Sequence, residues 1–391
     1  MSQTLRPAQR TRSFTESVIR EMTRVARETG AVNLAQGFPD FPAPEGMKEA
    51  AVRAIRGDIN QYAVTWGAPS LRNALAQWYR SRYDMDVDPD KHVTITCGAT
   101  EAMASVFLGL LDPGDEVVVL EPFYENYAPD ALLAGAEARF LALDPPEYRL
   151  HADRLEALVT PRTRALVLNT PNNPTGRVFS DDEMEAVARI CRERDLVVVT
   201  DEIYECILYE GRHRPMATLP GMADRTITIS GASKTFSVTG WRLGGIVAPE
   251  SITGAIRKVH DFLTVGAPAP LQEAWAWAIR ELGEEYFRSL ATQYRARRDL
   301  LVQGLQDAGF RCQAPEGAYY ILADFSQLSD DDDTAFSHRL AREAGVAPVP
   351  GSSFFHGGGG GSLVRFAFCK QMSTLQDGVE RLIRFSAAGG S

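Results

Sequence analysis

The feature that most constrains this chain is an alternation of short β-type runs with stretches of helical periodicity between about residues 40 and 285. Each run is rich in Val, Ile, Leu or Thr and ends in small or polar residues. Runs that are apolar on both faces are typical of strands buried in a parallel sheet. The pattern predicts an α/β fold with a doubly wound, mainly parallel sheet that binds ligands at the carboxyl ends of its strands. The runs are 93–97, 116–120, 165–169, 196–200 and 226–229.

The length of the chain predicts two domains. With 391 residues it can bury a large core and exceeds the usual size of one domain. We predict a large domain over residues 40–285. A smaller domain would combine residues 1–39 with residues 286–391, where the pattern is α+β.

Composition excludes several classes of function. The formal net charge of −10 offers no basic surface for nucleic acid, and no apolar run is long enough to cross a membrane. Five scattered cysteines, never in a CxxC pair, indicate reduced thiols and no zinc site or disulfide frame. Neither an HExxH nor a GxSxG motif is present, so we expect no metal. The expected location is the cytoplasm.

The position of one lysine indicates the chemistry. Of 41 basic residues only five are lysines, so this chain uses arginine wherever a positive charge alone is needed. Lys234 follows a turn of small residues, 230–233, directly after the last of the β-type runs. An amine can lose its proton and form a Schiff base, which a guanidinium cannot do. Lys234 is therefore a candidate catalytic residue, although a lysine on an exposed loop would show the same local pattern.

Other polar residues lie where predicted strands end. Ala99 and Thr100 open a helix after the first run, and the free N–H groups and positive dipole of a helix N-terminus favour an anion. Asp201 ends the fourth run, where its carboxylate needs a cationic partner or hydrogen bonds unless it caps a helix. Arg365 lies inside the apolar run LVRFAF, which is costly for an unpaired guanidinium unless the strand is an edge strand facing water.

Several sequence words carry a family resemblance. They are SKTFSVTGWRLGG around Lys234, NNPTG from Asn172, DEIYE from Asp201 and VRFAF around Arg365. Together with VNLAQGFPDFPAP near the N-terminus, they resemble the class I/II aminotransferases, and within them the branch of kynurenine, glutamine and methionine aminotransferases. These are fold-type I enzymes that depend on pyridoxal 5′-phosphate. The resemblance covers nearly the whole chain.

The resemblance implies roles around the cofactor ring. Lys234 would bond covalently to the cofactor and later move the substrate proton. Asp201 would pair with the pyridine nitrogen and keep it protonated, so that the ring can accept electrons. Tyr204 and Asn173 would hydrogen-bond the phenolic oxygen of the cofactor. Tyr124, an aromatic residue at the end of a predicted strand, would lie flat on the ring.

The resemblance also implies a phosphate site. Arg242, eight residues after the lysine, would hold the phosphate together with the backbone amides of Ala99 and Thr100. Some relatives add a serine three residues before the lysine. This chain has Gly231 at that position, and Ser233 is the nearer hydroxyl.

Substrate binding and assembly follow from the same resemblance. Arg365 would bind the substrate α-carboxylate side-on through two charge-assisted hydrogen bonds, with Asn173 beside it. Gly37 would let the backbone approach the substrate. The family implies a homodimer in which Tyr62 reaches the phosphate site of the partner subunit.

The implied activity is ping-pong transamination from a neutral, aromatic or sulfur-containing L-amino acid to a 2-oxo acid. One alternative is β-elimination on cysteine conjugates, a C–S lyase reaction that uses the same cofactor and residues. Another alternative is a non-catalytic cofactor-binding regulator, in which a domain of this kind serves a DNA-binding one. The acidic composition argues against the regulator.

Overall fold

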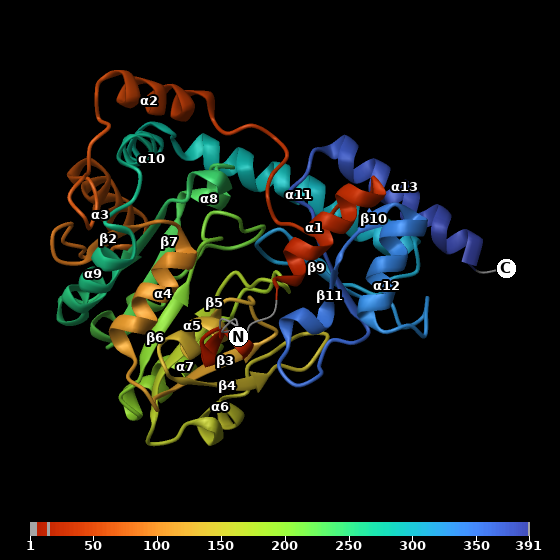
Figure 1. Ribbon diagram of the computed structural model, residues 1–391, viewed down its shortest axis with the longest axis horizontal. Helices are drawn as coiled ribbons and strands as arrows, with labels where there is room; N and C mark the ends of the chain where they lie inside the picture. The colour runs from red at the N-terminus through yellow and green to blue at the C-terminus, as the bar shows by residue number, and fades with distance from the viewer. Residues whose placement is uncertain (1–5, 14–15, 390–391) are drawn as a thin grey trace, which may run out of the picture.

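The computed structural model describes residues 6–13 and 16–389 and contains two separate main sheets (Figure 1). The larger sheet has seven strands in the order β2-β8-β7-β6-β5-β3-β4. Five neighbouring strands, from β7 to β4, are parallel, whereas β8 is antiparallel to both of its neighbours. The prediction of a mainly parallel sheet is confirmed. The strands are β2 (Val93–Thr96), β3 (Glu116–Glu121), β4 (Glu137–Ala142), β5 (Thr163–Asn169), β6 (Val197–Asp201), β7 (Thr226–Gly231) and β8 (Gly244–Val247).

Alternate side chains of the central strands bury against helices on opposite faces, which makes the sheet doubly wound. Val117, Val167 and Val199 pack in a cluster with α4 (Ala99–Leu110), α5 (Tyr127–Leu133) and α9 (Glu250–Thr264). Val118 and Val198 pack in another cluster with α6 (Ala152–Leu158) and α7 (Asp181–Glu193). The helices α2 (Glu45–Arg56), α3 (Pro69–Tyr83), α8 (Ala232–Thr235) and α10 (Ala269–Glu281) complete this part, near the β2 edge (Figure 1).

The second main sheet lies in the other half of the molecule. Its strands are antiparallel in the order β11-β12-β9, so that β12 is central. Helix α11 runs from the side of the large sheet into this half (Figure 1). The elements are α1 (Val18–Thr29), α11 (Glu284–Asp307), β9 (Tyr320–Asp324), α12 (Asp333–Arg339), β11 (Val349–Pro350), β12 (Leu363–Ala367) and α13 (Met372–Gly389), with the parallel pair β1 (Val32–Asn33) and β10 (Val346–Ala347).

Two separate sheets agree with the expected arrangement, while the domain boundaries at residues 40 and 285 stay predictions. Local signals locate helix ends: Ser180 accepts a hydrogen bond from the Glu183 amide at the start of α7, and Glu183 reaches back to the Ser180 amide. No helix within the described residues is long and apolar enough to cross a membrane.

Candidate active site

A cavity of about 120 Å³ lies at the carboxyl ends of the parallel strands. Its position follows from the sheet topology, because the loops after β5, β6 and β7 open at the same edge. Most of the predicted site residues meet in its wall. Those that line it are Ala99, Thr100, Tyr124, Asn173, Asp201, Tyr204, Ser233, Lys234 and Arg242.

Lys234 presents a buried amine to this cavity. It lies in α8, a single turn that directly follows β7. Its Nζ donates to the carbonyl oxygen of Gly37 at 3.2 Å and pairs with no carboxylate in the described part of the chain. Burial lowers the pKa of Lys234 to about 8. A lysine in this state can give up its proton near neutral pH, and the exposed-loop alternative is wrong.

Asp201 ends β6 and is held by a tyrosine that the sequence did not indicate. Its Oδ2 accepts a 2.7 Å hydrogen bond from the hydroxyl of Tyr127, in the first turn of α5. Its Oδ1 receives only a long contact, 3.4 Å, from the Ile203 amide, so Asp201 caps no helix. Burial raises the pKa of Asp201, while the Tyr127 hydrogen bond acts against this. A buried carboxylate with free acceptor capacity fits the protonated nitrogen of a pyridine ring.

Asn173 and Arg365 form a pair beside the cavity. Arg365 lies on the central strand β12, is 0% exposed, and donates from Nη1 to the Asn173 side chain at 2.8 Å and from Nη2 to the Ala35 carbonyl at 2.7 Å. The alternative of an edge-strand arginine that faces water is therefore wrong. The Arg365 Nε has no hydrogen-bond partner, and no described carboxylate pairs with this guanidinium.

The opposite end of the cavity fits a phosphate group. Helix α4 starts without a side-chain cap, which leaves its first amides free. Arg242 lies over this helix start, with Nη2 3.5 Å from the Thr100 hydroxyl, and forms no ion pair with any described acid. Gly98 has a φ of +87°, which favours glycine, and a Cβ there would lie 2.5 Å from the Arg242 Nη2. Ser233 lines the same cavity.

Gly37 lies on an extended segment that passes the cavity. Its carbonyl oxygen accepts hydrogen bonds from Lys234 and, at 2.9 Å, from the Tyr319 hydroxyl. A side chain at Gly37 would collide with the Tyr320 hydroxyl. That hydroxyl is 3.1 Å from the hydroxyl of Tyr204. Close approach, rather than a turn, is therefore the reason for glycine here.

Tyr62 is the predicted site residue that lies apart from the cavity and its neighbours. Its side chain is 86% exposed and does not line the cavity, so it does not pack in the core of this chain. Arg242 is exposed as well. A role for Tyr62 in a partner subunit stays a prediction.

Three residues that contact the predicted site residues were not identified from the sequence. Tyr127 holds Asp201, and Tyr320 lies under the Arg365 guanidinium at 4.2 Å. Asn169 links two strand ends, because it accepts from the Asn173 amide at 2.7 Å and donates to the Asp201 carbonyl at 2.8 Å. Asn169 alone carried a usable signal, since a polar residue ends an apolar strand there.

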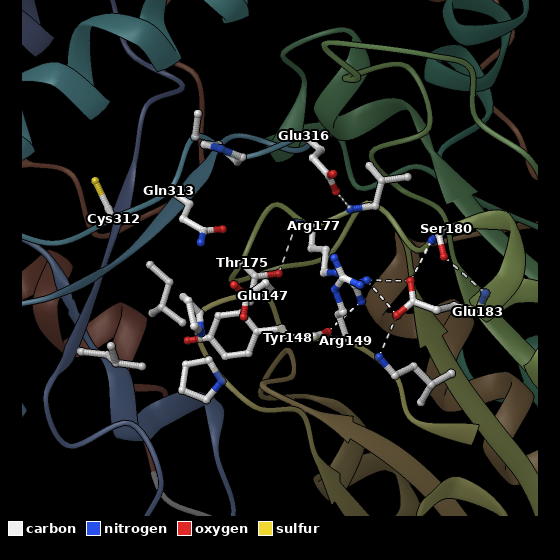
Figure 2. Close-up of a pocket in the computed structure, with 18 of the residues that line it drawn as sticks. Glu147, Tyr148, Arg149, Thr175, Arg177, Ser180, Glu183, Cys312, Gln313 and Glu316 are labelled. Atoms are coloured by element: carbon white, nitrogen blue, oxygen red, sulfur yellow. Dashed lines mark hydrogen bonds and ion pairs between the residues drawn. The ribbon is translucent and has the colours of Figure 1, made fainter. Parts of the chain in front are cut away.

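A second and larger cleft, of about 1130 Å³, lies beside the NNPTG turn, with Thr175 and Arg177 in its wall (Figure 2). A largely buried ion pair lies in its wall: Arg177 donates to both oxygens of Glu183 at 2.7 and 2.6 Å and to the Tyr148 carbonyl at 2.7 Å. Arg311 pairs with Asp324 at 3.0 Å. None of the predicted site residues lines this cleft.

Comparison with known proteins finds similarity along almost the whole chain. The family model described as "Aminotransferase class I and II" matches residues 29–382. A relative from Mycobacterium tuberculosis (strain ATCC 25618 / H37Rv), "Probable N-succinyldiaminopimelate aminotransferase DapC", is 42% identical, with 95% of this chain and 97% of the relative covered. The "Methionine aminotransferase" of Escherichia coli (strain K12) is 36% identical, with 94% and 95% covered. Human "Kynurenine--oxoglutarate transaminase 1" is 35% identical, with 93% and 94% covered.

The solved structures agree with these relatives. The structure of N-succinyldiaminopimelate aminotransferase from Mycobacterium tuberculosis superimposes with a TM-score of 0.94 at 42% identity. The superposition covers 97% of this chain and 100% of that chain.

Proposed function

This chain belongs to the class I and II aminotransferases, and we propose that its amino donors are neutral L-amino acids with aromatic or sulfur-containing side chains. The family depends on pyridoxal 5′-phosphate, so the chain is a pyridoxal-phosphate-dependent transferase. The relatives with 36% and 35% identity are named for methionine and kynurenine, which fall in the proposed donor class.

One observation carries the proposal for the substrate site. Arg365 is a fully buried guanidinium that no acidic group of the described chain neutralises, and its Nε is without a partner. A buried cation is costly unless an anion pairs with it. The α-carboxylate of an amino acid supplies that anion, and Asn173 lies beside it to fix its orientation.

We propose the following roles for the chain's own groups. Bound pyridoxal phosphate supplies the electron sink that accepts the electron pair of the substrate Cα–H bond. Asp201, oriented by Tyr127, holds the proton on the pyridine nitrogen. The Lys234 Nζ takes the proton from the substrate Cα and returns it on the cofactor side, for which its lowered pKa suits it. Tyr204 hydrogen-bonds the phenolic oxygen of the cofactor.

At the other end of the cavity, Arg242 and the first amides of α4 hold the phosphate, and Ser233 donates its hydroxyl. Ser233 lines the cavity, whereas the Gly231 position offers no hydroxyl. The Tyr124 side chain lines the same cavity, where it can lie on the cofactor ring.

The lining of the cavity favours an uncharged donor side chain. Lys234 and Arg242 are the only basic residues that line the cavity within the described chain, and both have proposed roles at the cofactor. Tyr124, Tyr320 and Met103 provide aromatic and sulfur-containing surface there.

A second donor is favoured by a separate observation. The relative named for N-succinyldiaminopimelate is 42% identical over 97% of its length, which exceeds the identity of the other two relatives. That donor carries carboxylates far from its reacting amine, so it would need basic groups beyond those that line the cavity.

A donor panel tests both candidates. Purified holoenzyme is assayed with methionine, phenylalanine, kynurenine, glutamate and N-succinyl-L,L-diaminopimelate, each with 2-oxoglutarate or pyruvate as acceptor. We expect the highest kcat/KM for the first three donors. A preference for the succinylated donor would overturn the proposal. Release of a thiol, pyruvate and ammonia from a cysteine S-conjugate without any acceptor would indicate β-elimination instead.

We further propose a homodimer, with a second copy of this chain over an exposed apolar surface. The surface joins two neighbouring segments, because Thr65 accepts a hydrogen bond from His260 at 2.9 Å. Phe262 on it is 91% exposed and Tyr62 is 86% exposed, which is unusual for large apolar side chains. The other members are Ile55, Ile59, Val64, Leu263 and Val265.

Sedimentation velocity of the wild type and of Phe262→Asp tests the dimer. We expect a wild-type dimer and a variant shifted toward monomer with weakened retention of pyridoxal phosphate, since Tyr62 would no longer reach the partner's site. A wild-type monomer that is fully active would overturn this assembly.

We also propose a cytoplasmic location. All five cysteines are free thiols in the structure, as expected for a protein of a reducing compartment. Fractionation of cells of the source organism, followed by detection of the protein, tests this location.

A further inference from the structure

The segment that passes the cavity is held by two lysines, the half-buried Lys234 and the buried Lys370. Lys234 donates to the Gly37 carbonyl oxygen at 3.2 Å. Lys370, only 2% exposed, donates from Nζ to the carbonyl oxygens of Gln36 at 3.2 Å and Phe38 at 2.8 Å. Three consecutive carbonyl groups are therefore bound by two ammonium groups.

Lys370 is an unusual group to bury. No acidic side chain of the described chain pairs with it, and its ammonium instead lies 4.0 Å from the centroid of the Phe38 ring. The three N–H bonds of an ammonium match two carbonyl oxygens and one aromatic face. A planar guanidinium has a different geometry, which gives a reason for lysine in a chain that uses arginine for nearly all other positive charges.

The segment held by Lys370 carries groups that touch the substrate site. The Ala35 carbonyl accepts from the Arg365 Nη2 at 2.7 Å, and the Gly37 carbonyl accepts from Lys234 and Tyr319. The backbone of Gly37 lies against the Tyr320 hydroxyl with no room for a side chain. A displacement of this segment would thus move the Ala35 carbonyl, a partner of Arg365, whereas Lys234 in the holoenzyme is held by its covalent bond to the cofactor.

Contacts at the ends of the segment do not replace Lys370. At one end, the Ala367 amide donates to the Leu34 carbonyl at 2.7 Å. At the other end, Asp40 accepts hydrogen bonds from the Gln371 amide at 2.5 Å and from the Thr374 hydroxyl at 3.0 Å. Among the described residues, only Lys370 reaches the carbonyl groups on both sides of Gly37.

We propose that Lys370 is a positioning residue for the amino-acid substrate. It acts through the backbone of residues 36–38, which it fixes against Arg365 and Lys234, and it touches neither substrate nor cofactor. This inference rests on the proposed function. Loss of Lys370 should therefore weaken substrate binding and leave the proton transfer at Lys234 and the cofactor site nearly unaffected.

The variants are Lys370→Met, Lys370→Gln and Lys370→Arg, with Lys258→Met, an exposed lysine of α9, as the matched control. In the Met and Gln variants we expect KM for the preferred donor, and Kd for hydrocinnamate measured by calorimetry, to rise roughly 10- to 100-fold with kcat nearly unchanged. Lys370→Arg should also bind the donor weakly, because a guanidinium keeps the positive charge but not the geometry of the ammonium. Lys258→Met should match the wild type.

Hydrogen exchange gives a readout that does not need turnover. In holoenzyme with Lys370→Gln, the milder variant, amides of residues 34–41 should exchange faster while peptides elsewhere keep their rates and the cofactor absorbance is unchanged. Unchanged exchange there, a uniform rise across the protein, full recovery in Lys370→Arg, or a fall in kcat with KM unchanged would each overturn the inference. If the wild type used none of the donors, the donor class would be wrong, and the exchange comparison would still decide on Lys370.

Discussion

Two hollows of this molecule, a cleft beside the NNPTG turn and the cavity at the strand ends, differ in volume and in whether their buried charged groups have ionic partners. The cleft beside the NNPTG turn is about 1130 Å³, and the charged side chains most buried in its wall, Arg177 and Glu183, are paired with each other (Figure 2). The cavity at the strand ends is about 120 Å³ and is bordered by charged groups without ionic partners in the described chain. These groups are Lys234, Arg242, Arg365 and Asp201, the last of which has only a tyrosine and a backbone amide as donors.

The difference teaches that unpaired buried charge is a better sign of a binding site than volume. Burial of an uncompensated charge is unfavourable, so such a group needs either polar contacts within the chain, as Lys370 has, or a ligand that completes it. In the large cleft, the buried charges of Arg177 and Glu183 neutralise each other and stabilise the fold. Burial raises the pKa of Glu183, but the Arg177 hydrogen bond and two backbone amides outweigh it, so the net effect lowers the pKa.

The largest expected effect comes from Lys234→Ala. Without its amine, no group is positioned to move the substrate proton, so kcat should fall by on the order of 10⁴-fold while pyridoxal phosphate still binds at Arg242 and the α4 amides. Single-turnover absorbance measurements with the preferred donor check this. Lys258→Ala is the control, and near-normal turnover by Lys234→Ala would refute the assignment of the cavity.

The next prediction compares the cavity with the cleft by replacing one arginine of each. Arg365→Met should raise KM for the donor roughly 100-fold, since two charge-assisted hydrogen bonds of about 1.5–3 kcal/mol each are lost. Arg177→Met should leave KM unchanged and lower the free energy of unfolding by about 2 kcal/mol, because Glu183 would keep its burial without its partner.

Steady-state kinetics and thermal unfolding of both variants provide the comparison. If Arg365→Met only lowered stability, Arg365 would not bind the donor. If Arg177→Met raised KM, the ion pair of the cleft would take part in donor binding. Either result would contradict the distinction between the cavity and the cleft.

The part of the fold that follows from local pattern was predictable from the sequence. Apolar runs before Asn169 and Asp201 located β5 and β6, and these strands pair in parallel as expected. The antiparallel direction of β8 was not predictable, because direction depends on connections and not on periodicity. Most site residues carried by the resemblance line the cavity, Gly37 and Arg365 lie beside it, and Tyr62 lies apart from it in a single chain.

The contacts between distant segments could not be read from the sequence. Tyr127 meets Asp201 across 74 positions, and Lys370 meets Phe38 across 332 positions. A buried tyrosine that packs and one that donates a hydrogen bond have the same local pattern, and only the packing of α5 on the sheet distinguishes them.

A third expectation concerns pH. Burial lowers the pKa of Lys234 to about 8, so the amine of the apoenzyme is protonated below this pH and neutral above it. Only the neutral amine attacks the cofactor aldehyde. The rate of pyridoxal phosphate capture, followed by stopped-flow absorbance, should rise about tenfold per pH unit up to pH 8 and then level off. A plateau only near the ordinary lysine value of 10.5 would show that burial does not govern this amine.

The smallest effect compares two buried tyrosines, one from each hollow. Tyr127→Phe removes the donor to Asp201 Oδ2, which raises the pKa of that carboxyl further and frees its orientation. Retention of pyridoxal phosphate, measured by equilibrium dialysis, should weaken by about tenfold, the cost of one hydrogen bond to a charged group. Tyr148→Phe is the matched control, because Tyr148 lines the cleft and its hydroxyl bonds to no described residue. Equal retention in both variants would mean that Tyr127 only fills space, and that Asp201 needs no support from α5.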